Sequence, residues 1–224
     1  TAFMSNFSKR NKQIVLLTIS IITLLIFCYM AYKRQSAESI FAVFPLLAVG
    51  ITPILGKYVD NKGKAASMLM LGSILLIVCH LTFAFILPMF KGSNIGGVIV
   101  AFITILILGS SFSLVPASLW PSVPKLVDKK VIGSAYALIF LIQNIGLWLF
   151  PLLIGKILNA SNPDIAQALI DKTMTPEVAA VSYNYTNPLL MLALLGVAAL
   201  ILGLILKMVD KKKGYGLELP NIQK

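Results

Sequence analysis

The sequence predicts an all-α integral membrane protein whose six transmembrane helices form one bundle. Three observations lead to this fold class. Hydrophobic residues make up 58% of the 224 residues and charged residues only 12%, which is more apolar surface than a soluble domain can bury. The apolar residues gather into six stretches of membrane-spanning length. The basic residues concentrate in alternate connections between these stretches, as in multi-pass membrane proteins.

The six apolar stretches define the predicted spans. Each holds about 19 residues or more, and ~20 helical residues cross the ~30 Å hydrocarbon core of a bilayer. They cover residues 14–32, 39–57, 65–89, 95–119, 131–157 and 187–209. We therefore expect a six-span bundle over residues 14–209. A basic lead-in (1–13) precedes it and a basic tail (210–224) follows it, both on the cytoplasmic side.

The charge distribution predicts the orientation of the spans. Of the 19 Lys and Arg residues, 12 lie in the lead-in, the tail and the connections that follow the second and fourth stretches, and two more, Lys57 and Lys207, lie at the adjoining span ends, which gives 14 on the predicted cytoplasmic side. Basic residues near span ends accumulate on the cytoplasmic face. The net charge of +11 is thus a signal of topology and not of nucleic-acid binding. It also favours contact with anionic lipid headgroups, which makes the lipid bilayer a predicted partner.

The longest connection, residues 158–187, is expected to carry two short surface helices. Asn162-Pro163-Asp164 and Thr175-Pro176-Glu177 each place a capping residue before a proline and an acidic residue. A capping side chain followed by proline at the first helical position is typical of a helix start.

The connection between the second and third spans carries a motif. Gly56, Asp60, Gly63 and Lys64 stand in the spacing Gly-x-x-x-Asp-x-x-Gly-Lys. This spacing resembles the loop signature of the major facilitator superfamily, which follows the second span of each six-helix half. The family has a basic residue directly after the aspartate, whereas this chain has Asn61 there. The resemblance implies that Asp60 contacts helix ends of the opposite half and stabilises one open conformation.

A second resemblance covers the segment 116–155. Its motifs are Leu119-Trp120-Pro121-Ser122-Val123-Pro124-Lys125-Leu126-Val127, Gly133-x-Ala135-Tyr136, Gln143-Asn144-Ile145-Gly146-Leu147 and Pro151-Leu152-Leu153-Ile154-Gly155. They resemble the branch of the superfamily that contains the lysosomal dipeptide transporter and its bacterial relatives.

The two resemblances together cover residues 39–209 and imply spans eight to twelve of a twelve-span transporter. They imply a small-molecule solute and an N-terminal six-helix half as partners. That half is missing here, and the start at Thr1 instead of Met agrees with a fragment. They also imply that spans seven, eight, ten and eleven line a central cavity, while spans nine and twelve face lipid.

The fourth span is rich in small residues and contains a proline. Gly109-Ser110-Ser111 is followed by Pro116. Small residues let helices approach closely, and a proline leaves a carbonyl for a neighbour to satisfy. One interpretation is tight packing with a kink, and the other is a flexible cavity wall that moves during transport.

The fifth span carries the strongest candidates for solute contact. Gln143 and Asn144 share one helix face, roughly 140° wide, with Tyr136, Phe140 and Trp148. Trp120, at the end of the fourth span, is a further cavity candidate. Amides bind a polar or zwitterionic solute without the desolvation cost of a charge. The alternative is that both amides bond to the backbone of a neighbouring helix.

Other functions fit less well. An enzyme inside the membrane would need a metal cluster, a carboxylate pair or an activated nucleophile, and the spans hold His80 and no Asp or Glu. No enzyme activity, cofactor or metal site is predicted. A non-transporting scaffold or a truncated remnant remains the alternative to transport of a small polar solute, such as a dipeptide, by alternating access. The predicted location is the bacterial inner membrane, with an endo-lysosomal membrane as the alternative.

Overall fold

Every element that the computed structural model describes is a helix, which confirms the predicted all-α class. The structure describes residues 43–90 and 95–221, together with the isolated positions Thr18, Ile21, Leu25 and Tyr29. The helices are α4 (Val43–Lys62), α5 (Ala65–Leu81), α6 (Ile95–Leu126), α7 (Ile132–Ser161), α8 (Pro163–Ile170), α9 (Pro176–Ser182) and α10 (Thr186–Lys213). The predicted lead-in and nearly all of the predicted first span lie outside the described residues.

Four segments of the described chain are long and apolar enough to cross a membrane. They are Ala65–Met89, Ile95–Leu126, Lys129–Ser161 and Thr186–Lys213. They coincide with the third to sixth predicted spans, so the described residues account for four of the six. The first of them is α5 continued by a π-helical turn and a short 3₁₀ turn. Helix α4 covers residues 43–57 of the second predicted span and runs on into the charged loop, ending at Lys62.

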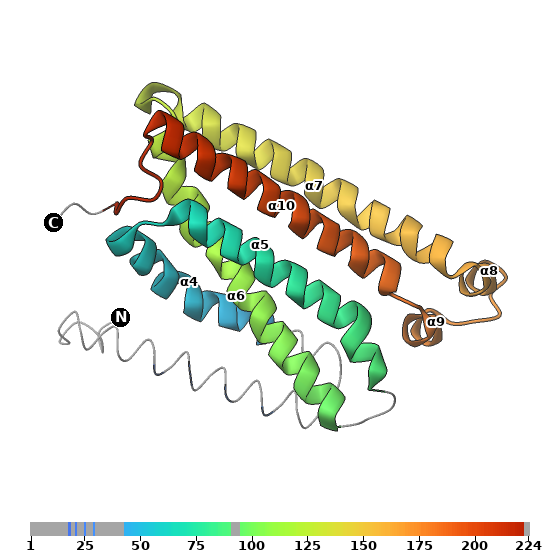
Figure 1. Cartoon of the computed structure of the whole chain (residues 1–224). Coiled ribbons are helices and arrows are strands. Elements are labelled where there is room, and N and C mark those ends of the chain that lie inside the picture. The colour runs from blue at the N-terminus through green and yellow to red at the C-terminus, as the bar shows by residue number, and fades with distance from the viewer. Residues whose placement is uncertain are drawn as a thin grey trace, which may run out of the picture.

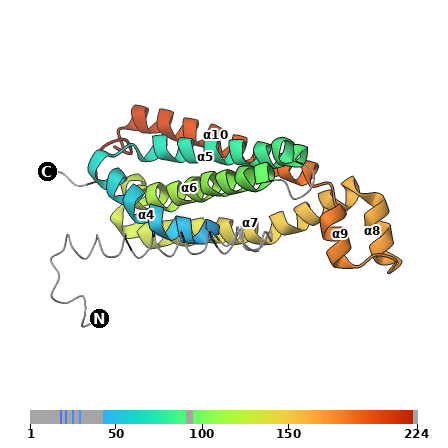
Figure 2. The same cartoon turned by 90° about the horizontal axis from the view of Figure 1, so that it is seen from below.

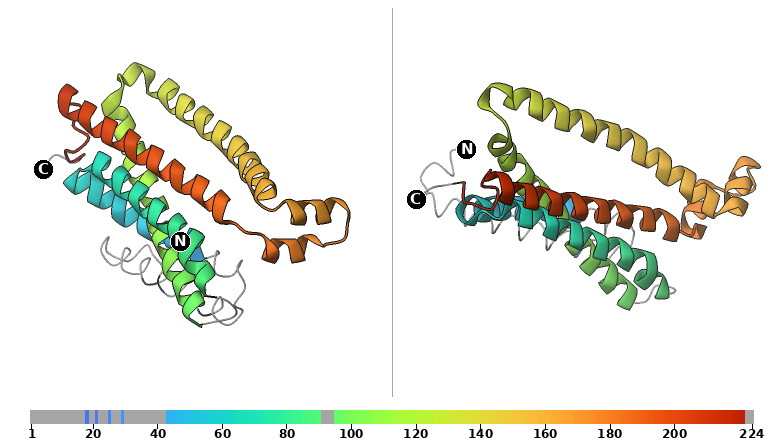
Figure 3. Two further views of the ribbon diagram at one scale, coloured as in Figure 1. Left: turned by 45° about the vertical axis from the view of Figure 1, so that its right-hand side comes forward. Right: turned by 45° about the horizontal axis from the view of Figure 1, so that its top comes forward.

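Helices α4, α6, α5 and α10 pack in this order, each against the next, with α7 set apart. Helices α5 and α10 lie side by side along most of their length, and α6 packs against both α5 and α4 (Figure 1 and Figure 2). Helix α7 contacts α10 and, near its own start, α6, but it stands away from α4 and α5 (Figure 3). Although its sequence is as apolar as that of a membrane span, none of the residues of α7 is buried.

Glycines bring α5 and α10 into close contact. Gly196 and Gly203 lie two turns apart on α10 and face Ile77 and Met70 of α5. A Cβ atom on Gly196 would lie 2.8 Å from Cγ1 of Ile77, and one on Gly203 would lie 2.9 Å from Cγ of Met70. A side chain at either position would force the facing Ile77 or Met70 side chain to shift, so glycine favours this close approach.

Small polar residues join α6 to its two neighbours. The hydroxyl of Ser111 donates to the carbonyl of Gly72 on α5 (2.7 Å), and that of Ser113 reaches the carbonyl of Ala48 on α4 (3.4 Å). Gly109 and Ser111 are both buried. These contacts match the packing interpretation of the Gly109-Ser110-Ser111 segment.

The two short helices predicted between the last two spans are confirmed as α8 and α9. The side chain of Asn162 does not cap α8 and instead ties the end of α7 to the approach to α10. Its amide donates to the carbonyls of Leu158 (2.8 Å) and Asn184 (3.1 Å), and its oxygen accepts the N–H of Asn184 (2.8 Å).

Candidate functional site

Three of the six predicted cavity residues meet in an aromatic cluster between α6 and α7. The ring of Trp120 stacks on that of Phe140, with centroids 5.1 Å apart and planes inclined by 30°. The ring of Tyr136 lies tilted against Trp120 at 5.8 Å. Such pairs stabilise contacts by about 0.5–1.5 kcal/mol beyond the apolar area that they bury. The cluster fixes the start of α7 to the last turns of α6.

A proline explains the hydrogen bond in this cluster. In a regular helix the carbonyl of Trp120 would accept the N–H of residue 124, but Pro124 has no N–H to donate. The hydroxyl of Tyr136 donates to that carbonyl at 3.1 Å. The tyrosine thus satisfies a backbone acceptor that the proline leaves free, which matters most where water is scarce. The sequence indicated this free carbonyl, because Pro124 lies four residues after Trp120.

The other three predicted cavity residues lie farther along α7 and are exposed. Trp148 keeps 68% of its surface accessible, and Gln143 and Asn144 are exposed as well. The amide of Asn144 donates to the carbonyl of Phe140 in its own helix (2.8 Å). Within the described residues, neither amide bonds to a neighbouring helix. The middle of α7 therefore presents polar and aromatic groups that the rest of the described chain does not cover.

The predicted loop motif closes a sharp turn between α4 and α5. Gly56 and Asp60 lie in α4, while Gly63 (φ +75°) and Lys64 (φ +65°) both adopt the left-handed conformation. Left-handed backbone favours glycine, so the local conformation explains why the motif has a glycine at position 63. At Gly56 a Cβ atom would meet nothing within 4 Å.

Sequence reasoning missed the residue that Asp60 binds. The side-chain amide of Asn221 donates to Oδ1 of Asp60 (2.8 Å), and the backbone N–H of Asn221 donates to the carbonyl of Asp60 (3.0 Å). The two residues are separated by 161 positions in the sequence. No local pattern indicates such a pair, because only the folding of α10 brings the tail to this loop.

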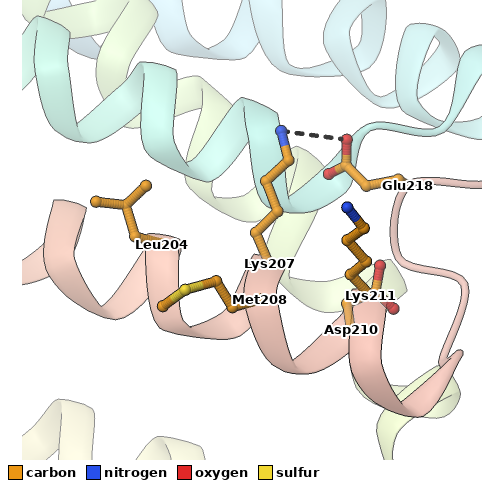
Figure 4. Close-up of a pocket in the computed structure, with 6 residues that line it drawn as sticks. All are labelled: Leu204, Lys207, Met208, Asp210, Lys211 and Glu218. Atoms are coloured by element: carbon orange, nitrogen blue, oxygen red, sulfur yellow. Dashed lines mark ion pairs between the residues drawn. The ribbon is translucent and has the colours of Figure 1, made fainter.

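A cavity of about 420 Å³ lies beside the end of α10 (Figure 4). It is lined by Leu204, Lys207, Met208, Asp210, Lys211 and Glu218. An ion pair between Lys207 and Glu218 (3.9 Å) crosses it. None of the predicted cavity residues lines this pocket, so it is separate from the aromatic cluster.

Comparison with known proteins supplies the functional context. Over 131 residues, the chain is 29% identical to the lysosomal dipeptide transporter MFSD1 of Mus musculus. The chain is similar to a known transporter. The proteins of that name from Homo sapiens (29% over 129 residues) and Danio rerio (30% over 130 residues) match equally well. These results confirm the resemblance to that branch of the major facilitator superfamily.

The similarity has a limited extent. The aligned part covers 58% of this chain and 25% of the mouse protein, so it spans about a quarter of the length of such relatives. No family model and no solved structure matches the chain. With the four membrane-length segments, the similarity supports a multi-pass membrane protein of transporter type.

Proposed function

We propose that this chain forms the C-terminal six-span half of a major facilitator transporter. It would carry a small polar solute of the dipeptide kind by alternating access, against an N-terminal six-helix half. The observation that carries the proposal is α7, an apolar helix with no buried residue that presents Gln143, Asn144 and Trp148. Amides are costly against lipid, so this face favours a protein or cavity lining over lipid, and solute sites of these transporters form near the bilayer midplane between two repeats.

The relatives support the choice of solute class. They are named dipeptide transporters, and a dipeptide is zwitterionic at neutral pH. The amides of Gln143 and Asn144 can each donate to a carboxylate and accept from an ammonium group. Aromatic faces such as Trp148 also attract a cationic group. The lysosomal location of the relatives is compatible with an endo-lysosomal membrane, and a bacterial inner membrane remains the prediction from the sequence.

Substitution of the two amides tests the proposal. In the full-length transporter, we expect Gln143→Ala and Asn144→Ala each to raise the KM for dipeptide uptake by a few-fold to tenfold. The reason is that one lost hydrogen bond costs about 0.5–1.5 kcal/mol. The melting temperature in detergent should stay near that of the wild type, because neither amide bonds to another helix in the described residues. Radiolabelled dipeptide uptake and melting curves would be measured on the same preparations.

A third variant serves as the matched control. Asn159→Ala removes an exposed amide of the same helix near its far end, and we expect its KM to equal that of the wild type. A lower melting temperature with unchanged KM in both Gln143→Ala and Asn144→Ala would remove these residues from the site. Absence of uptake by the correctly folded full-length wild type would favour the non-transporting scaffold instead.

A further inference from the structure

Residues after α10 form a strap over the cytoplasmic loop predicted from the sequence. Helix α10 ends at Lys213, and the left-handed backbone of the capping residue Gly214 (φ +70°) reverses the chain direction. Residues 215–221, called the strap below, then return across the turn between α4 and α5 (Figure 1). Leu217 at the centre of the strap is fully buried (0% exposed).

The strap supplies the N-terminal cap that α5 lacks. The residue before α5, Lys64, makes no side-chain cap. Instead, the carbonyl of Leu217 accepts the N–H of Ala65 (3.1 Å), and the carboxylate of Glu218 accepts the N–H (2.9 Å) and the hydroxyl (2.7 Å) of Ser67. A carboxylate at a helix N-terminus satisfies free N–H groups and interacts favourably with the helix dipole. Glu218 therefore stabilises the start of α5 from the opposite end of the sequence.

Two further helices hold the strap. The ammonium group of Lys125, in the last turn of α6, donates to the carbonyls of Gly216 and Leu219, both at 2.9 Å. On α10, the carboxylate of Asp210 accepts the N–H of Leu217 (3.0 Å). Lys207 of α10 pairs with Glu218, as Figure 4 shows.

The final anchor is the loop aspartate. Asn221 binds Asp60 of α4 through both its backbone N–H and its side-chain amide. The strap thus joins the ends of α4, α5, α6 and α10. Within the described residues it makes no hydrogen bond or ion pair to α7, which contacts these helices mainly through α10 and the aromatic cluster.

We propose that the strap makes α4, α5, α6 and α10 move as one body during alternating access, with Asn221 as the residue that positions Asp60. The proposal rests on the transport function proposed above. Alternating access proceeds largely by rocking of rigid helix bundles, so the bundle must transmit motion from one helix to the next. Release of the strap would leave the α4–α5 turn free to move separately, and turnover would slow while solute affinity stayed unchanged.

Amide hydrogen exchange tests whether the strap is docked. The N–H groups of Lys64, Ala65 and Ser67 donate to the strap, so they should exchange slowly in the wild type. We expect Asn221→Asp, which replaces a donor by a second carboxylate beside Asp60, to accelerate their exchange at least tenfold. Asp60→Asn combined with Asn221→Asp restores a donor opposite an acceptor and should return slow exchange.

Asn61→Asp is the matched control for the added charge. It introduces the same carboxylate one residue from Asp60, but the amide of Asn61 bonds to Lys57 in its own helix (2.8 Å) and not to the strap. Exchange of residues 64–67 should therefore stay at the wild-type rate in this variant. If the N–H groups of Lys64, Ala65 and Ser67 exchange at the wild-type rate in Asn221→Asp, the proposed docking of the strap by Asn221 is wrong.

Dipeptide uptake by the full-length transporter tests the role of the strap. We expect Asn221→Asp to lower the maximal rate at least fivefold with KM within twofold of the wild type. The double variant Asp60→Asn with Asn221→Asp should recover the maximal rate. Faster amide exchange with an unchanged maximal rate would overturn the proposed joint movement of the helices. The strap would then serve only as a structural cap of α5. No uptake by the wild type would refute the transport function together with the coupling, whereas the exchange result would still establish the strap.

Discussion

Gly63→Ala is expected to lower the free energy of unfolding by about 3 kcal/mol or more, as the sum of two effects. Gly63 has φ +75°, and left-handed backbone costs an alanine roughly 1–2 kcal/mol. A Cβ atom there would also overlap the strap backbone, at the carbonyl of Glu218 and 2.7 Å from the carbonyl oxygen of Leu219. These are backbone atoms and cannot rotate away. The strap would have to leave, and each hydrogen bond to the carboxylate of Glu218 contributes about 1.5–3 kcal/mol.

Gly214→Ala provides the control for this prediction. Gly214 has nearly the same conformation (φ +70°), but a Cβ atom at that position would meet nothing within 4 Å. It should therefore show the backbone cost alone, about 1–2 kcal/mol. Thermal unfolding in detergent would compare the two variants. Equal losses of stability would show that the strap contributes nothing at Gly63.

Gly196→Ala is expected to lower the free energy of unfolding by about 1–3 kcal/mol through overpacking. Its Cβ atom would lie 2.8 Å from Cγ1 of Ile77 and 3.5 Å from the backbone nitrogen of the same residue. The branched side chain of Ile77 has few rotamers in a helix, so it cannot easily make room. Helices α5 and α10 would have to separate along the interface that Gly196 and Gly203 form.

The control for this interface is Gly155→Ala on α7. A Cβ atom at Gly155 would meet nothing within 4 Å, and alanine favours a helix over glycine by about 1 kcal/mol. We expect Gly155→Ala to be neutral or stabilising in the same unfolding measurement. Addition of Ile77→Ala to Gly196→Ala should recover part of the stability, because it removes the overlapping atom. Equal stability of Gly155→Ala and Gly196→Ala would contradict a close α5–α10 contact.

Much of the helical architecture could be predicted from local sequence. A long apolar stretch must form a helix in a bilayer, because its backbone groups find no other partners there. That rule located the four membrane-length segments, and proline after a capping residue located α8 and α9. The helix ends were less predictable. Helix α6 continues past the apolar stretch to Leu126, because helical hydrogen bonding does not stop where hydropathy falls.

The candidate site was also predictable only in part. Residue types and helical spacing identified Trp120, Tyr136 and Phe140, and the structure brings these three together. Spacing could not say which neighbour each would meet. Gln143, Asn144 and Trp148 lie where the described chain offers no cover, so their proposed role depends on the N-terminal half that we propose.

The sequence by itself determined that the chain is an all-helical membrane protein, and its motif predicted a connection near Asp60 and Gly63 after the second span. The first property follows from apolar length, which is local, and the second from the resemblance of the motif to a known loop signature. Only the tertiary structure decided that the tail returns as a strap, because the partners Asp60 and Asn221 are 161 residues apart. The tail sequence is charged and short, and nothing in its pattern distinguishes a docked segment from a solvated one. Its position follows from helix α10, which ends beside the uncapped start of α5 and so brings Glu218 to the N–H groups that need an acceptor.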